Sequence, residues 1–580
     1  MSSSLFAAGL GLAALLSVPA PPRVSLANDD DPLSLREHAA LRESMAELAA
    51  AHPDLARLEL VGTSRAGRAI EALRITAVDE PRDVPGILLV ANLEGTRVFA
   101  SAVALDHARR LLEGYADSES VRMLLDANVV WVVPRANPDA AEARFLEPRA
   151  EHLASGVGVD DDRDGRQGED PPADLNGDGL VTMMRVPDPD GEWIPDPNDP
   201  RALVKADPAK GEHGTFALYP ESRDRDGDER FGEDQPHDGR VDRNFPAGWQ
   251  EGEAAAGLFA TDDPEARALC EFVLARPNLS LVVIYDGPGN LVEDPKSVAD
   301  DAKAKQRIPP AGWLESDAGY LKEIARRYRR AVGNETEGED DDAGTFGRWC
   351  YEHRGLFVLC ADLWELPFGE ASKDEADGAD EKAEGEDPQE EQAEPERKPS
   401  EDAKRLLWVD AHEGEAWRFV PWTPFDHPEL GEVEIGGFAP FARVEPPAEE
   451  GAKIARDHFA WFTTLGSLPA RAKIVECTRE RVGDGLFEVR AVIENSGFLP
   501  LLSRSGRRTR TTRPARLKLL LPEAGGLVAG KRQVLIEDLS GSGGRFEYTA
   551  LVRGPEGMEI AVTLDSDHAG SDMRTAEENQ

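Results

Sequence analysis

The sequence predicts an α/β protein, with a mixed, mainly parallel twisted sheet flanked by helices and a C-terminal all-β sandwich. Two observations carry this prediction. Between about residues 35 and 363, short apolar runs that indicate buried strands alternate with helical patterns, which is typical of a mainly parallel sheet covered by helices. From about Ala470 the pattern changes to short alternating strands separated by turns, which is typical of a β-sandwich.

A chain of 580 residues is too long for a single hydrophobic core. We expect a signal peptide, an α/β domain, a β-sandwich and a polar tail, at residues 1–27, 28–467, 468–567 and 568–580. Two insertions interrupt the α/β domain. The first, at 158–240, is rich in Asp and Gly and is expected to be mostly loops. The second, at 369–404, is an acidic low-complexity tract with too few apolar residues to fold, and it should be disordered.

The N-terminus predicts export. The apolar segment Leu5–Ala20 is too short to span a bilayer comfortably, and Ser25-Leu26-Ala27 resembles a small-x-Ala cleavage site. The alternative is an apolar, disordered N-terminus, because Met1–Ser4 lacks the usual positive charge. No later stretch is long and apolar enough for a membrane span.

The composition excludes nucleic acid as a default partner, because phosphate binding needs a basic footprint and the net charge is −45. Only four cysteines occur, and none forms a Cys-x-x-Cys pair: Cys270, Cys350, Cys360 and Cys477. A cysteine zinc site is therefore disfavoured. We expect buried free thiols, although export would permit a disulfide between Cys350 and Cys360.

The elements follow from apolar periodicity and turn signals. In the first half we expect helices at Leu35–Ala51 and Val98–Leu112, and strands at Leu58–Val61, Ile70–Thr76, Gly86–Val90 and Val129–Val133. In the second half we expect helices at Asp263–Leu274, Leu314–Val332 and Ala452–Leu465, and strands at Leu279–Tyr285 and Leu356–Leu363. The sandwich strands are expected at Phe487–Glu494, Ala515–Leu521, Gln533–Asp538, Arg545–Val552 and Met558–Leu564. Between the first two of these lies a basic stretch, Arg504–Arg516, which we expect to be a solvated loop. Binding of a polyanion, or pairing with the acidic tract of the same chain, are the alternatives.

Three turns carry a family resemblance. Val90-Ala91-Asn92-Leu93-Glu94-Gly95-Thr96-Arg97 follows a predicted buried strand, Pro134–Ala140 follows the next one, and Val241-Asp242-Arg243-Asn244-Phe245-Pro246 is the most specific match. They resemble the patterns Gly-Asn-x-His-Gly-x-Glu, Pro-x-x-Asn-Pro-Asp-Gly and Asp-Leu-Asn-Arg-Asn-Phe-Pro of the zinc carboxypeptidase family, the carboxypeptidase A-like metallopeptidases. The resemblance covers most of the chain.

The resemblance implies a zinc site whose three ligand positions have all changed. The His and Glu of the first turn correspond to Glu94 and Arg97, and the later His corresponds to Asp286. Zinc accepts carboxylates. A guanidinium, in contrast, has no acceptor lone pair and stays charged. We therefore expect Arg97 to replace the metal and to pair with Glu94 and Asp286. A second His-x-x-Glu spacing, at His412–Glu415, lacks the strand and glycine context and indicates an ordinary surface histidine.

The resemblance also implies a general base and a substrate pocket. The base position is Asp362, one methylene shorter than the family's Glu, and Glu434 is the alternative base. Arg243 matches the arginine that grips the terminal carboxylate of a peptide, with Asp242 where the family has Asn. Arg144 and Arg149 are candidates for the family's second anion-stabilising arginine, and no motif separates them.

The Asp-rich insertion predicts calcium binding through three acidic loops, because alternate residues in a tight turn point several oxygens inward. Its candidate ligands are Asp160, Asp162, Asp164, Asp174, Asn176, Asp178, Asp224, Asp226, Asp228 and Glu233. Each loop departs from the EF-hand pattern, and a solvated acidic turn is the alternative for each of them.

Three functions follow as hypotheses. The first is an active zinc carboxypeptidase that releases C-terminal amino acids. The second is an exported, catalytically degenerate relative without zinc that binds peptide or protein C-termini or acts as a scaffold. The third is a calcium-stabilised adhesion or assembly protein. The substituted ligand positions favour the second.

Overall fold

A computed structural model describes residues 31–151, 170–225, 227, 229–232, 240–253, 256–285, 289–292, 295–300, 307–333, 343–369 and 397–578. The predicted signal segment lies outside the described residues, as does the tract at 370–396. Seven predicted site residues also lie outside them: Asp160, Asp162, Asp164, Asp226, Asp228, Glu233 and Asp286. Within the described part of the chain, no helix is long and apolar enough to cross a membrane.

The central sheet has six strands in the order β1-β2-β4-β3-β9-β12. Their bounds are Ala56–Thr63, Ala69–Ile75, Val129–Val133, Gly86–Ala91, Leu279–Tyr285 and Phe357–Ala361. β4, β3, β9 and β12 run parallel to one another. β2 pairs antiparallel with both β1 and β4. The sheet is therefore mixed and mainly parallel, which confirms the predicted fold class.

Alternate residues of the central strands face two hydrophobic cores. In β3, Ile87 and Leu89 pack in one core, while Leu88 and Val90 pack in the other. The first core is covered by helices α1, α2, α3, α6 and α10, at His38–Ala51, Val98–Gly114, Glu119–Leu125, Glu315–Val332 and Ala448–Thr464. The second is covered by α5 and α7, at Pro264–Leu274 and Phe346–Glu352. Burial on both faces explains why these strands are continuous apolar runs.

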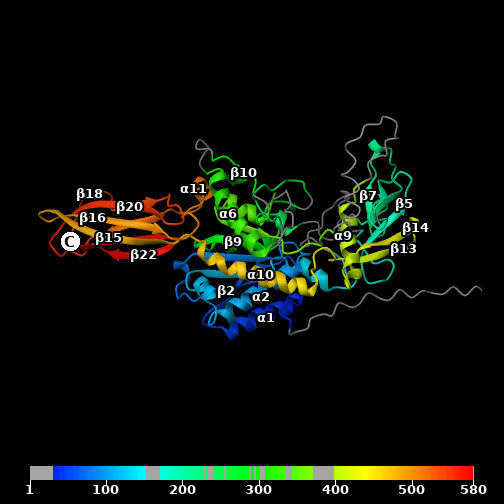
Figure 1. Ribbon diagram of the computed structural model, residues 1–580, viewed down its shortest axis with the longest axis horizontal. Helices are drawn as coiled ribbons and strands as arrows, with labels where there is room; N and C mark the ends of the chain where they lie inside the picture. Colours follow the sequence, from blue (N-terminus) through cyan, green and yellow to red (C-terminus); the bar gives the residue numbers. More distant parts are fainter. Residues whose placement is uncertain are drawn as a thin grey trace, which may run out of the picture.

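A second six-stranded sheet lies to one side of the central sheet (Figure 1) and was missed in the sequence. Its order is β13-β14-β5-β8-β6-β7, at Phe419–His427, Gly431–Phe438, Met183–Pro187, Phe216–Pro220, Trp193–Pro195 and Leu203–Lys205. Helix α9, Glu401–Ala411, packs beside it. Residues 158–240, expected to be mostly loops, thus contain four short strands between 183 and 220 that the sequence did not predict, and the acidic tract predicted at 369–404 overlaps the start of α9. These four strands have five residues or fewer, so local periodicity is weak, and β5 pairs with β14 far away in sequence.

The C-terminal domain is a β-sandwich, as predicted. One sheet has the order β18-β20-β16-β15-β23, at Gly526–Ala529, Gly544–Arg553, Leu486–Asn495, Ala472–Gly483 and Glu577–Glu578. The other has the order β19-β17-β21-β22, at Gln533–Ile536, Ala515–Leu520, Ala561–Ser566 and Gly570–Thr575. Because β22 and β23 belong to these sheets, the predicted polar tail at 568–580 begins too early. Shorter elements elsewhere are α4 (Pro138–Glu142), β10 (Ser297–Val298) and β11 (Trp313–Leu314).

The basic stretch joins the sandwich to the α/β domain instead of forming a solvated loop. It contains the short helix α11, Arg504–Thr509, which Figure 1 shows at the junction between the two domains. The buried Asp317 carboxylate of α6 accepts hydrogen bonds from the backbone N–H groups of Arg504, at 2.8 Å, and Ser505, at 3.1 Å. These bonds fix the sandwich to the body. The prediction of buried free thiols is confirmed for all four cysteines.

Candidate functional site

The candidate site lies where three neighbouring parallel strands end. β3, β9 and β12 are adjacent, so their carboxyl ends meet at one edge of the sheet, which is where open α/β sheets place their ligands. The turn that contains Glu94 and Arg97 follows β3, and Asp362 follows β12. Asp286, which follows β9, is outside the described residues.

The turn after β3 is held by Asn92. This residue takes a left-handed backbone conformation, with φ of 57°, and its side-chain amide donates to the carbonyl oxygens of Glu94, at 2.8 Å, and Gly95, at 3.4 Å. Helix α2 then begins immediately after Arg97. The turn thereby presents Glu94 and Arg97 at the edge of the sheet.

Arg97 forms an ion pair with the predicted base position. Its guanidinium donates to the Asp362 carboxylate at 2.9 Å and to the backbone carbonyl of Trp364 at 3.1 Å. Both side chains are largely buried, at 16% and 11% exposed. Beside them is a cavity of about 10 Å³, lined by Arg97, Asp362, Trp364 and a few apolar neighbours, which is room for about one water molecule. The described ion pair of Arg97 is with Asp362, which the sequence did not predict. The predicted partner Asp286 lies outside the described residues, so that pairing stays a prediction.

Glu94 pairs with a cation to which the sequence analysis gave no role. One carboxylate oxygen accepts the Thr96 hydroxyl at 3.1 Å, and the other lies 3.4 Å from the Arg240 guanidinium. Arg240 is three residues before Arg243 in the same turn, so its position next to the best-matched motif was the available signal. Glu94 also lies close enough to raise the pKa of both Asp362 and Asp242.

Asp362 is a weak acid despite its ion pair. Burial raises its pKa to about 6; Arg97 opposes this shift, while Glu365 and Glu94 add to it. Removing the charge from water therefore outweighs the attraction of one guanidinium. At neutral pH the Arg97–Asp362 pair is charged, and below about pH 6 the carboxyl gains a proton.

Arg243 and Asp242 lie together in a short turn, as the resemblance implied. The Arg243 guanidinium donates to the Ala343 carbonyl at 3.3 Å. The Asp242 carboxylate accepts from the backbone N–H of Phe346 at 2.8 Å, and enclosure raises its pKa to about 7, although Arg243 and Arg240 oppose the shift. The charge beside Arg243 therefore changes near neutral pH.

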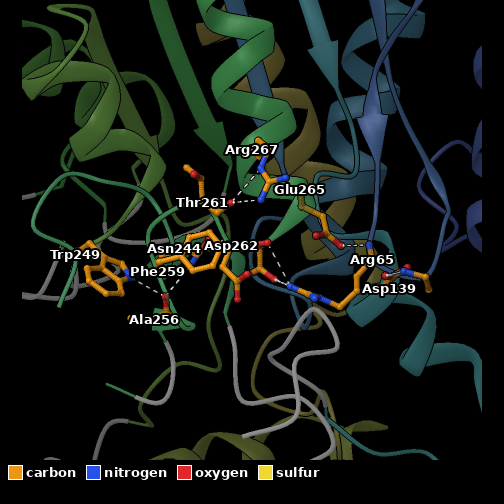
Figure 2. Close-up of polar contacts among 12 residues, drawn as sticks. Arg65, Asp139, Asn244, Trp249, Ala256, Phe259, Thr261, Asp262, Glu265 and Arg267 are labelled. Atoms are coloured by element: carbon orange, nitrogen blue, oxygen red, sulfur yellow. Dashed lines mark hydrogen bonds and ion pairs between the residues drawn. The ribbon is translucent and has the colours of Figure 1, made fainter. Parts of the chain in front are cut away.

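Figure 2 shows the hydrogen bonds of Asn244, which follows Arg243 in this turn, and those of Arg65. The Asn244 amide donates to the carbonyls of Ala256, at 2.6 Å, and Phe259, at 3.0 Å. Arg65 bridges from the body, because its backbone N–H donates to the buried Glu265 carboxylate at 3.0 Å and its guanidinium donates to the Asp262 carbonyl at 3.4 Å. These hydrogen bonds therefore fix the conformation of the turn that carries Arg243.

The two candidates for a second anion-binding arginine differ in their partners. Arg144 is buried and forms two hydrogen bonds with Glu445, one of them 2.9 Å long. Arg149 is half-buried, and within the described chain its guanidinium has no hydrogen-bond partner. Burial, and next the nearby Arg144, lower its pKa. The structure therefore favours Arg149 as the cation that is available to a ligand.

Other predicted residues lie elsewhere. Glu434, the alternative base, is on β14 in the second sheet, 2.7 Å from the Arg185 guanidinium. His412 is exposed, stacks on Trp408 with ring centroids 3.9 Å apart, and bonds to the Trp408 carbonyl. Among the described residues, no group of three or more His, Cys, Asp or Glu side chains is arranged to hold a metal ion.

The donors at the expected zinc position do not fit zinc. Of the three ligand positions, Glu94 offers oxygen atoms, but Arg97 offers only N–H donors and a fixed positive charge. That charge lies 2.9 Å from the carboxylate that would otherwise serve as base. No step of peptide hydrolysis through a metal follows from these residues.

In the described part of the Asp-rich insertion, acidic side chains accept hydrogen bonds from backbone N–H groups of their own loops. The Asp174 carboxylate accepts from the backbone N–H groups of Gly177, Asp178 and Gly179 at 2.7, 3.2 and 2.9 Å. Asn176 and Asp178 bond to each other at 3.2 Å. Asp224 accepts similarly from Gly227 and Glu229. Each of the two loops bends on itself, as the acidic-turn pattern predicts, and the calcium prediction stays a prediction.

The comparisons with known proteins agree with the motifs. Residues 41–177 match the family model described as zinc carboxypeptidase, and residues 471–577 match a domain of unknown function, DUF8731. A zinc carboxypeptidase from Saccharothrix mutabilis subsp. capreolus is 32% identical over 94 residues, 16% of this chain and 21% of the relative. Carboxypeptidase D from Mus musculus is 35% identical over 122 residues, 18% of this chain and 9% of the relative.

The likeness is confined to part of each protein, because the chain spans about a fifth or less of the length of these curated relatives. Among solved structures, carboxypeptidase A from Helicoverpa armigera is 14% identical and matches 59% of this chain and 67% of its own, with a TM-score of 0.36. The family model and the curated relatives together show that residues 41–177 are similar to the zinc carboxypeptidase family.

Proposed function

We propose that this protein is a catalytically degenerate member of the zinc carboxypeptidase family that binds peptide C-termini without zinc. The observation that carries the proposal is the ion pair between Arg97 and Asp362, 2.9 Å long and largely buried. It joins a ligand position to the base position of the family. The side chains at the ligand position and at the base position therefore engage each other instead of a metal and a water.

The electrostatics support an internal cation in place of a metal. At about 4 Å, a guanidinium and a divalent cation repel each other by several kcal/mol, even at an effective dielectric of about 20. A carboxylate shared with Arg97 would also have to leave its partner to polarise a water. Both costs oppose zinc binding at this edge of the sheet.

Peptide binding rests on Arg243. A guanidinium matches a carboxylate with two parallel hydrogen bonds, and the Asn244 and Arg65 network holds the turn that carries it. The half-buried Arg149 adds a second cation. These residues suit a terminal carboxylate as ligand, with or without cleavage.

The test compares the wild type with a variant that restores the family's ligands: Glu94→His, Arg97→Glu and Asp286→His. We expect the purified wild type to bind less than one zinc in ten molecules and to release no C-terminal amino acids from peptides, and the variant to bind zinc stoichiometrically. Metal analysis and a peptide-release assay measure both. Stoichiometric zinc together with peptide release in the wild type would establish the alternative, an active zinc metallocarboxypeptidase.

Binding of peptide C-termini has its own test. A peptide with a free terminal carboxylate should bind about tenfold or more tightly than the same peptide with a terminal amide, because a charge-assisted pair is lost. Arg243→Met should remove the difference. Arg267→Met is the matched control, because this exposed side chain bonds only to the Thr261 carbonyl. Equal affinity for both peptides would reject this part of the proposal.

Calcium binding and export belong to the same proposal. Support for calcium comes from the repeated acidic turns, of which 174–179 and 224–229 bend as such loops do. Support for export comes from the segment at 1–27. A calcium-stabilised adhesion protein is the alternative, and retention of adhesion after loss of the Arg243 cation would favour it.

A further inference from the structure

A polar cavity of about 150 Å³ lies at the junction of the α/β domain and the β-sandwich. The charged and polar lining from the α/β domain is Arg276 and Arg354, and that from the sandwich is Thr511, Thr512, Arg513, Asp567 and His568. The site is separate from the edge that carries Glu94 and Arg97, and the domains touch closely beside it. A methyl group added at Gly355 would meet the Gly506 backbone at 2.3 Å. The cavity is thus a gap in an otherwise tight interface.

Three guanidinium groups line this cavity, and two of them have a carboxylate of the chain within 4.0 Å. Arg276 lies 2.6 Å from Glu59, and Arg513 lies 4.0 Å from Asp567. Arg354 is different: within the described chain it has no ion pair or hydrogen bond, and its Nε is shielded from solvent without a partner. Burial lowers its pKa, as expected for a cation that lacks a counter-charge.

Two further polar side chains of the sandwich, Thr512 and His568, line the same cavity and are each only 8% exposed. The Thr512 hydroxyl is shielded from solvent and has no hydrogen-bond partner among the described residues. Burial lowers the pKa of His568; Asp567 and a backbone hydrogen bond at Leu279 oppose this shift, whereas Arg354 adds to it. Charged and polar side chains from both domains therefore line one space.

We propose that this cavity binds a small oxyanion of the phosphate or sulfate class, which bridges the α/β domain and the sandwich. The ligand would accept hydrogen bonds from Arg354 on one side and from Arg513 on the other. A guanidinium fork matches such oxygens geometrically. The volume exceeds that of one water by about tenfold, so a tetrahedral anion fits with its remaining waters. This inference does not depend on the proposed peptide binding.

The experiment titrates the full-length protein with inorganic phosphate by calorimetry, in a buffer free of phosphate and sulfate. We expect saturable 1:1 binding that sodium chloride at equal ionic strength does not reproduce. Arg354→Met should weaken phosphate binding by about tenfold or more, because one charge-assisted contact is lost. Arg354→Lys, which keeps the charge but not the fork, should fall between the two.

The matched control is Arg516→Met. Arg516 belongs to the same basic stretch, but it is exposed, pairs with Asp565 at 2.6 Å and does not line the cavity. It should bind phosphate as the wild type does, which separates a defined site from the general attraction of a basic surface. Equal loss in both variants, unchanged binding in Arg354→Met, or an equal response to chloride would each overturn the proposal. Arg513→Met, which removes the mostly exposed cation on the sandwich side of the cavity, should weaken binding severalfold and gives a second measurement independent of Arg354→Met.

Discussion

Two partly buried arginines in this protein have opposite electrostatic surroundings. Arg97, at the edge of the central sheet, lies 2.9 Å from the Asp362 carboxylate. Arg354, at the junction with the sandwich, has no such partner within the described chain, and its Nε is shielded from solvent. Asp362 of the chain itself neutralises the charge of Arg97, whereas Arg354 has no carboxylate bonded to it within the described chain.

The comparison teaches how a buried charge indicates function. A buried ion pair that is broken leaves an uncompensated charge, which is costly. Arg97 and Asp362 therefore stabilise each other, and under the proposed function Arg97 takes the place of a metal at this edge. Arg354 carries that cost already, and a bound anion would remove it. The same type of side chain can therefore either occupy a metal position, when it is paired with a carboxylate, or offer a site for an anion, when it is unpaired.

The largest expected effect comes from Arg97→Met, which leaves Asp362 buried without its cation. We expect a loss of about 3 kcal/mol in the free energy of unfolding at pH 7.5, measured by urea denaturation. The double variant Arg97→Met/Asp362→Leu, which removes both charges, should recover most of it. Equal stability of the single and double variants would show that the pair is not coupled.

The same substitution has a pH signature. The pKa of Asp362 is about 6 in the folded protein, above its ordinary value, so the folded state binds the extra proton and this group's contribution to stability falls as pH rises toward 6. Without Arg97 the pKa should rise further. The deficit of Arg97→Met should therefore shrink below about pH 5, where the carboxyl is protonated in both proteins.

Arg354→Met should act in the opposite direction. In buffer free of phosphate and sulfate, removal of an uncompensated cation should leave stability unchanged or raise it by about 1 kcal/mol, because methionine keeps much of the volume. In phosphate the order should reverse, since only the wild type gains a ligand. Thermal unfolding in the two buffers measures this, and a destabilised variant without phosphate would contradict the comparison.

A calcium titration tests the Asp-rich insertion, in which acidic residues outnumber basic ones. If calcium binds, about 1 mM should raise the free energy of unfolding by about 1 kcal/mol for a site of about 0.2 mM affinity. Asp174→Asn keeps an acceptor for the backbone N–H groups that bond to Asp174 but removes a charge, so it should reduce the shift. An equal shift with magnesium would indicate general screening.

The smallest effect concerns Asp242 beside Arg243. Its pKa is about 7, so at pH 8 it is mostly charged and opposes a peptide carboxylate, whereas at pH 6 it is mostly neutral. We expect peptides with a free C-terminus to bind about threefold more tightly at pH 6 than at pH 8. Asp242→Asn should flatten the profile. A profile that is the same in wild type and variant would remove Asp242 from the binding site.

Much of the central sheet was predictable from local pattern. The strands Val129–Val133 and Leu279–Tyr285 have the predicted bounds, because residues buried on both faces make continuous apolar runs between polar turns. The second sheet was not predictable in this way. Its strands β6 and β7 have three residues each, and β5 pairs with β14, which is far away in sequence.

The candidate site was predictable in its residues but not in its pairing. The turn motifs identified Glu94, Arg97, Asp362 and Arg243, and the structure brings the first three to one edge of the sheet. Which carboxylate pairs with Arg97 depends on the strand order β3-β9-β12 and on side-chain reach, and a separation of 265 residues leaves no local signal. Arg354 was missed for the same reason, since lack of a partner is a tertiary property.

The second sheet has a consequence for proteolysis. Its strands β5–β8 precede the acidic tract, whereas β13 and β14 follow it, and β14 pairs with β5 through three residues in register. A protease that cut the chain between residues 370 and 396 would therefore yield two fragments that stay bound to each other. Electrophoresis under denaturing conditions should resolve them, while gel filtration should show one particle of unchanged size.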